Sequence, residues 1–249
     1  MGKKDYPMEL SKEQVHAILN EAEKKDEFDY VLFLTLATTG KRIGELYGVQ
    51  RCKEIGRKVV GKKRFFNKGK GYNVDKTIPV IKKINKWVGG VRVRDIDLEK
   101  GEMRVWILKT EKRKEGEEER IKITGRQTPT LLPAKTLQKL RSFIRSNRLT
   151  AEDYVFRKEG RGYRQIQNKI KYYAKKAGIE TETKREGVVY SLSIHSLRHH
   201  FITELKRKGL TNNEIIKLTG HKNEKTLSSY DHVISIDLKD KVMDILNEL

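Results

Sequence analysis

The spacing of apolar residues near the amino terminus is typical of helices. One apolar face recurs with the period of an α-helix and comprises Leu10, Val15, Ile18, Leu19 and Ala22. Ser11, with Gln14 three residues later, matches a capping box at the start of this helix. A more apolar stretch, Phe28–Ala37, predicts a buried helix, and the following Thr38-Thr-Gly40 predicts its end.

The helical period recurs in several later segments, whereas three segments alternate with the period of a strand. Further helices are predicted at residues 42–49, 134–147, 163–177, 195–208, 215–219 and 236–249. Strands are predicted at residues 91–97, 103–109 and 120–124, with a charged hairpin tip at 110–119. Together these elements predict a mainly helical α+β fold with a small antiparallel β-sheet.

Residues 51–90 interrupt this order, because they show little apolar periodicity and are rich in Lys, Arg and Gly. Their basic residues are Arg51, Lys53, Arg57, Lys58, Lys62, Lys63, Arg64, Lys68, Lys70, Lys76, Lys82, Lys83 and Lys86, and their acidic residues are Glu54 and Asp75. One interpretation is a solvated basic loop. We favour a DNA-contacting element, because so dense a positive charge is unfavourable without a counter-charge. Phe65, Phe66, Tyr72 and Trp87 would then serve as packing or stacking groups.

The composition of the whole chain points to the same class of partner. The 249 residues carry 55 Lys and Arg against 34 Asp and Glu, which gives a formal net charge of +21. This excess favours a polyanionic partner, with nucleic acid first and an anionic membrane surface second. No apolar run approaches the roughly 20 residues that span a bilayer, and no signal peptide is apparent. The single Cys52 excludes an internal disulfide and a Cys-rich zinc site, which fits a reducing cytoplasm. The sequence shows no cluster with zinc spacing and no Walker-type glycine loop, so we expect no metal or other cofactor.

The chemistry of the chain is concentrated in three short segments. Two arginines stand in Thr38-Thr-Gly40-Lys-Arg42-Ile-Gly-Glu45 and in His195-Ser-Leu-Arg198-His199, and Leu218-Thr-Gly220-His221 is followed by Tyr230. Two guanidinium groups can hold the non-bridging oxygens of a phosphodiester through paired N–H donors. Imidazoles transfer protons near neutral pH, and a tyrosine hydroxyl can attack phosphorus and hold it covalently. The combination suggests breakage and rejoining of DNA without a metal.

These segments, in this order and with this spacing, resemble the tyrosine recombinase (phage integrase) family. The matched pieces are Arg42 in T-G-x-R-I-x-E-L, the H-x-L-R-H box at 195–199, the L-x-G-H box at 218–221, and Tyr230. The resemblance extends from about Leu10 to the end of the chain. It implies metal-free and ATP-independent DNA cleavage through a 3′-phosphotyrosine link, followed by transfer to a 5′ hydroxyl group.

The resemblance also implies a role for each residue. Arg42 and Arg198 would bind the scissile phosphate, with Glu45 orienting Arg42. His195 would handle the proton of the nucleophile Tyr230 or hydrogen-bond the phosphate, which His221 would also contact. A lysine on the β-hairpin serves as the general acid in the family. Lys109 is our choice for this role, and its neighbours Lys112 and Lys114 are alternatives.

The domain organisation follows from the same resemblance. Residues 1–249 would form the catalytic domain, with residues 51–90 inserted between the helix that carries Arg42 and the next strand. The amino-terminal DNA-clamping domain of the family is expected to be absent. Family members act as tetramers on two DNA sites, and the apolar face of 236–249 suits docking on a neighbouring protomer or packing within its own chain.

Several simpler interpretations stay open at this level. Arg42 could form only a surface ion pair with Glu45, His199 is evenly balanced between a functional and a packing role, and His200 is expected to be structural or exposed. Three other functions are compatible with the chain: a type IB topoisomerase-like relaxing enzyme, a catalytically silent DNA-binding protein, and a basic RNA-associated protein. Of these, the tight box pattern favours the recombinase.

Overall fold

A computed structural model describes residues 6–67, 72–110, 121–220, 242–243 and 245–247 of the chain. Side chains within 50–67, 72–87, 107–110 and 121–128, and that of Arg185, lie outside this description. The chain divides into two compact units. One comprises residues 1–48 and 89–249, and the other is Val49–Val88.

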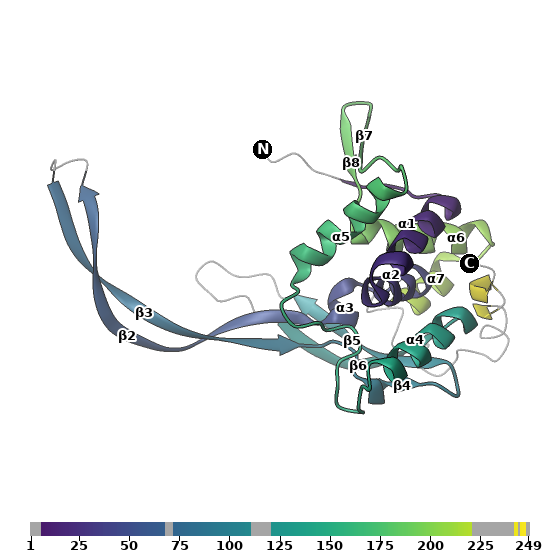
Figure 1. Ribbon diagram of the computed structural model, residues 1–249, viewed down its shortest axis with the longest axis horizontal. Helices are drawn as coiled ribbons and strands as arrows, with labels where there is room; N and C mark the ends of the chain where they lie inside the picture. The colour runs from purple at the N-terminus through teal and green to yellow at the C-terminus, as the bar shows by residue number, and fades with distance from the viewer. Residues whose placement is uncertain (1–5, 68–71, 111–120, 221–241, 244, 248–249) are drawn as a thin grey trace. The chain divides into compact units, whose positions relative to one another are not determined.

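The larger unit contains seven described helices. They are α1 (Lys12–Lys25), α2 (Glu27–Thr39), α3 (Ile43–Tyr47), α4 (Ala134–Ser146), α5 (Tyr163–Lys176), α6 (Ile194–Arg207) and α7 (Asn212–Thr219). The predicted capping box opens α1, because the Gln14 amide donates to the Ser11 hydroxyl and the Ser11 amide donates to the Gln14 side chain. As predicted, α2 is buried along almost its whole length, and it contacts α1, α4 and α6 (Figure 1). The centre of the core is therefore this apolar helix.

A buried acidic side chain fixes the other face of α2. Asp29 is fully buried, accepts a hydrogen bond of 2.7 Å from the Tyr173 hydroxyl on α5, and is ion-paired to Arg161. Arg161 also donates to Asp26, the N-cap of α2, at 2.6 Å. A buried carboxylate is tolerated only with such partners, so this network locks α2 to α5 and to the loop before it.

Two small sheets accompany the helices of the larger unit. They are formed by β1 (Tyr6–Pro7), β8 (Val188–Ser191) and β7 (Glu182–Arg185), and by β4 (Ile96–Asp97), β5 (Glu102–Thr110) and β6 (Ile121–Leu131). The second sheet is antiparallel and confirms the α+β fold class and two of the predicted strands. The sequence pattern did not indicate β7 and β8, which are short and joined by a turn with positive φ at Glu186 and Gly187.

The prediction of a continuous strand at 91–97 is wrong. Residues Val93–Asp95 form a 3₁₀ turn, and only Ile96–Asp97 pair as strand β4. The Asp95 carboxylate accepts a 2.9 Å hydrogen bond from the Arg92 amide. Local side-chain-to-backbone bonds of this kind compete with sheet pairing, so the alternating pattern here reflects a capped turn.

The smaller unit is a two-stranded antiparallel ribbon of β2 (Val49–Asn67) and β3 (Tyr72–Val88). Pairing runs from Val49 opposite Val88 to Asn67 opposite Tyr72, with two register shifts. A basic loop is therefore the wrong description of 51–90. The predicted helix at 42–49 also ends early, at Tyr47, because Gly48 has φ 85° and the chain then enters the ribbon.

Little of the predicted carboxyl-terminal helix lies among the described residues. Val242–Met243 and Ile245–Asn247 are helical, and the remainder of 236–249 lies outside the description. Val242, Ile245 and Leu246 are buried against a cluster that includes Phe201 and Leu205. These residues pack within their own chain, which is one of the two expected arrangements. Among the residues that the structure describes, no helix is long and apolar enough to cross a membrane.

Candidate active site

The turn between α2 and α3 positions the first predicted phosphate ligand. Gly40 caps α2 in the left-handed conformation, with φ 59°. A Cβ atom at Gly40 would lie 2.3 Å from Cδ1 of Phe201 on α6, so only glycine permits this close approach of the turn to α6. The turn that carries Lys41 and Arg42 is thereby held against the helix that carries the second arginine.

Arg42 stands at the N-cap of α3 and is oriented by Glu45. Its backbone N–H donates to the Glu45 carboxylate at 2.8 Å, and its guanidinium donates to the same group at 3.1 Å. Glu45 is buried, whereas the side chain of Arg42 is 39% exposed. A fixed carboxylate thus holds a guanidinium that is partly exposed, and a guanidinium has N–H donors beyond the one bonded to Glu45 with which to bind an anion.

Arg198 is buried on α6 and joins two distant segments. It donates to the Gly40 carbonyl at 2.5 Å and to the Thr219 carbonyl, at the end of α7, at 3.2 Å. Desolvation, and then the positive charge of Arg42, lower the pKa of Arg198 to about 10. Arg198 is therefore still charged at neutral pH, beside a second guanidinium whose repulsion a bound phosphate would relieve.

The three histidines of α6 fall in different environments. His195 and His199 are exposed, and their pKa values are lowered, first by partial desolvation and then by the charge of Arg198. Arg42 also lowers the pKa of His195, and a neutral imidazole can accept a proton at pH 7. His200 is buried with Nδ1 3.0 Å from the Leu10 carbonyl oxygen, which confirms a structural role.

Lys41 is a member of this site that the sequence did not indicate. It is only 3% exposed, and its ammonium donates a hydrogen bond of 2.9 Å to the Leu218 carbonyl on α7. Desolvation lowers its pKa to about 8; Glu45 opposes this shift, and Arg198 and Arg42 reinforce it. Its adjacency to Arg42 was the one available signal, but nothing in the local pattern distinguishes a buried lysine from a solvated one.

The remaining predicted residues lie largely outside the description. Lys109 is on β5 with its backbone opposite Lys122, but its side chain is not described, and neither are Lys112 and Lys114. A capping box opens α7, with Thr211 and Glu214 bonded reciprocally, and Gly220 caps its carboxyl end. His221 follows directly in the sequence, and it and Tyr230 lie outside the described residues.

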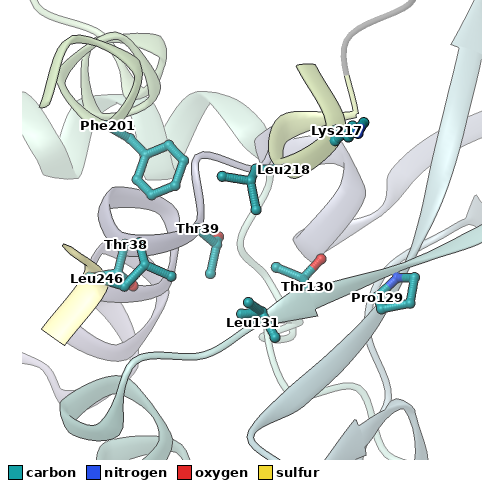
Figure 2. Close-up of a pocket in the computed structure, with 9 residues that line it drawn as sticks. All are labelled: Thr38, Thr39, Pro129, Thr130, Leu131, Phe201, Lys217, Leu218 and Leu246. Atoms are coloured by element: carbon teal, nitrogen blue, oxygen red, sulfur yellow. The ribbon is translucent and has the colours of Figure 1, made fainter. Parts of the chain in front are cut away.

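A narrow pocket adjoins the buried side of the Gly40 turn. Its lining comes from α2, β6, α6, α7 and the carboxyl-terminal residues, with Phe201 and Leu218 facing it from α6 and α7 (Figure 2). Thr38, Thr39, Leu131 and Leu246 complete much of the lining. Apolar packing thus brings the end of α7 close to the turn, where Lys41 and Arg198 bond to it.

The described part of the chain contains no group of three or more His, Cys, Asp and Glu residues placed to hold a metal ion. The functional groups that it does bring together are the guanidinium of Arg42 at the start of α3, the guanidinium of Arg198 on α6, and the imidazole of His195 on α6, whose pKa is lowered. Such a set can neutralise a phosphodiester and accept a proton beside it.

Comparison with known proteins supports the same interpretation. Residues 86–235 match the family model described as the phage integrase family, a stretch that includes Lys109, His195, Arg198, His221 and Tyr230. Tyrosine recombinase XerA of Saccharolobus solfataricus is 32% identical over 153 residues, which are 61% of this chain and 42% of that protein. The chain therefore spans less than half the length of this curated relative.

Solved structures share the fold at lower identity. The integrase of mycobacterium phage Brujita has a TM-score of 0.54 at 14% identity, covering 100% of this chain and 60% of that one. The Tn1549 transposon integrase, solved in complex with transposon right end DNA, has a TM-score of 0.53 at 17% identity, covering 97% and 66%. At these identities the likeness concerns the fold.

Proposed function

Because the chain belongs to the phage integrase family, we propose that it cleaves and rejoins DNA at specific sites through a covalent link to Tyr230. The observation that carries this proposal is the convergence of Arg42 and Arg198. Arg198 bonds to Gly40, two residues before Arg42, and the positive charge of Arg42 is among the causes that lower the pKa of Arg198. Two adjacent cations held by buried partners are arranged for one dianionic phosphorane-like transition state.

The proposed cleavage step conserves the energy of the phosphodiester. The Tyr230 oxygen forms a bond to phosphorus while the bond from phosphorus to the 5′ oxygen breaks. The phenolic proton passes to neutral His195, and Lys109 gives a proton to the departing 5′ oxygen. Arg42, Arg198 and His221 stabilise the charge on the non-bridging oxygens. Rejoining is the reverse, with a 5′ hydroxyl of another strand attacking phosphorus, so neither metal nor ATP is required.

Double-stranded DNA is the proposed partner, and the ribbon is a proposed second contact with it. A two-stranded ribbon has dimensions that fit the major groove of DNA. Paired positions of an antiparallel ribbon lie on one face, and successive pairs alternate between faces. From the register, one face carries the positions Arg51, Lys53, Lys58, Lys63, Lys76, Lys82 and Lys86 and no acidic residue.

The opposite face of the ribbon contains both acidic residues. Glu54 is paired with Lys83, and Asp75 with Arg64, so each acidic position lies directly opposite a basic one. The net positive charge is therefore concentrated on the acid-free face, which we assign to the phosphate backbone. Assembly into a tetramer on two DNA sites, as expected from the sequence, belongs to the same proposal.

The experiment uses a nicked duplex that carries a candidate target sequence, which traps the cleaved state because the short product dissociates. Wild type and Tyr230→Phe are compared in EDTA on a denaturing gel. An adduct with wild type alone supports the proposal. Adducts with both proteins assign the nucleophile to another tyrosine, and binding without any adduct across the candidate sites favours the silent DNA-binding protein. Relaxation of one supercoiled duplex without exchange between two duplexes favours the topoisomerase-like alternative.

A further inference from the structure

Two buried cations bond to the carboxyl end of α7. The Lys41 ammonium donates to the Leu218 carbonyl at 2.9 Å, and Arg198 donates to the Thr219 carbonyl at 3.2 Å. The last carbonyls of a helix have no partner within the helix and carry the negative end of its dipole. Lys41 and Arg198 therefore occupy the positions where cations stabilise a helix end most effectively.

A purely structural purpose does not explain a lysine at position 41. It is 3% exposed, and burial opposes its charge strongly enough to lower its pKa to about 8. An apolar side chain of similar length would fill the same space without the desolvation penalty. A destabilising charge kept inside a functional site is typical of a group whose position serves the chemistry.

Contact with the substrate is not its role, because the ammonium faces the α7 carbonyl from within the protein and not solvent. Arg42, which follows Lys41 in the chain, has a partly exposed side chain. Arg198 on α6 is close enough for its charge to lower the pKa of Lys41. Lys41 thus joins the segment of the first phosphate ligand to the helix that ends at Thr219, two residues before His221.

We propose that Lys41 is a positioning residue that fixes the carboxyl end of α7 against the Arg42 turn and so holds the segment of Arg42, Arg198 and that helix end in register. This inference rests on the proposed DNA cleavage. Arg198 ties the Gly40 carbonyl to Thr219, and Lys41 ties its own turn to Leu218, so two parallel links hold the same pair of segments. Losing one link leaves the fold intact and lets the helix end shift.

The test compares Lys41→Met with wild type and with Lys24→Met. Lys24 is an exposed lysine of α1, with its side chain 71% exposed, so its replacement removes one charge without disturbing the site. Three quantities are measured for each protein: the melting temperature, the dissociation constant for target DNA, and the rate of adduct formation at saturating DNA. A separate measurement follows amide hydrogen exchange at residues 216–220.

The expected result for Lys41→Met is a selective loss of rate. Adduct formation falls about 10- to 100-fold, the range that small displacements of catalytic groups produce. The melting temperature is unchanged or higher, DNA affinity matches that of Lys24→Met, and exchange at residues 216–220 is faster. A rate equal to wild type, or a loss of rate that merely follows a lowered melting temperature, overturns the inference.

Failure of the proposed function would be distinguishable. If wild type forms no adduct, the cleavage proposal fails, and unchanged exchange at residues 216–220 in Lys41→Met then also overturns the positioning role. If wild type forms the adduct and Lys41→Met matches it in rate and exchange, only the role of Lys41 is wrong.

Discussion

The larger unit and the ribbon use positive charge in opposite ways. In the larger unit, the two arginines of the site, Arg42 and Arg198, are partly or fully buried. Glu45 accepts a hydrogen bond from Arg42, and the carbonyls of Gly40 and Thr219 accept hydrogen bonds from Arg198. In the ribbon, basic positions are many, and all but two lack an acidic position directly opposite. The first arrangement suits recognition of one phosphate with defined geometry. The second suits attraction to a long polyanion, which requires charge density and not fixed geometry.

We expect the largest effect of a single substitution at Arg42. We expect Arg42→Lys to lower the rate of adduct formation at saturating DNA by about 100- to 1,000-fold, because a lysine cannot reproduce the paired donors of a guanidinium. Arg57→Lys in the ribbon should change the rate and affinity less than about twofold, since a point charge suffices there. Single-turnover cleavage measures both variants. Equal effects at the two positions would remove the distinction between geometry and charge density.

A second expectation concerns the pH dependence of stability at Lys41. Its pKa is about 8 in the folded protein and 10.5 ordinarily, so the unfolded chain binds more protons between these values. Stability then rises with pH across this window, because deprotonation removes the penalty of the buried charge. Denaturant unfolding from pH 7.5 to 10.5 should show wild type gaining up to about 3 kcal/mol relative to Lys41→Met. Parallel curves for the two proteins would contradict a buried charged lysine.

Two triple variants of equal charge test which face of the ribbon contacts DNA. Replacing Lys53, Lys58 and Lys82 by Gln alters the acid-free face, and replacing Arg57, Lys62 and Lys83 by Gln alters the other. We expect the first variant to bind DNA about tenfold more weakly and to reduce the slope of log affinity against log salt by up to about 3. The second should have the smaller effect on both. Binding measured at several salt concentrations tests this, and equal slopes would remove the assignment of a DNA-facing side.

The smallest expected effect is at the cap of α7. Thr211→Ala removes the hydroxyl that accepts a hydrogen bond from the Glu214 backbone N–H. This should lower the free energy of unfolding by about 1 kcal/mol. Because the carboxyl end of α7 is held separately by Lys41 and Arg198, the cleavage rate at saturating DNA should stay within about twofold of wild type. Chemical denaturation measures the first quantity. A large loss of rate would mean that α7 is positioned from its amino end.

The same two regions show what the sequence could predict. Burial selects apolar residues, so the continuous apolar stretch at 28–37 and the capping box at Ser11 made two helices predictable from the sequence. In the ribbon the backbone hydrogen bonds between strands define the structure, and these leave little trace in the order of side chains. The prediction of a strand at 91–97 failed because a capped turn there has the same alternation of apolar and polar residues as a strand.

The site was predictable to the extent that its residues carry distinctive chemistry. Arg42 and Arg198 lie in recognisable boxes, and the structure brings their segments together through Gly40. Lys41 stands in the same box, but its role depends on burial and on a carbonyl 177 positions away, which no local pattern encodes. The catalytic roles assigned to Lys109, His221 and Tyr230 stay predictions.

The most direct test of covalent catalysis is to identify the residue that DNA modifies. The adduct from a nicked duplex is digested with nuclease and trypsin, and the nucleotide-bearing peptide is sequenced by mass spectrometry. Covalent catalysis by Tyr230 predicts a modified peptide of residues 226–239 with the phosphate on its single tyrosine. A phosphate on any of the nine other tyrosines, or an adduct that survives in Tyr230→Phe, would contradict it.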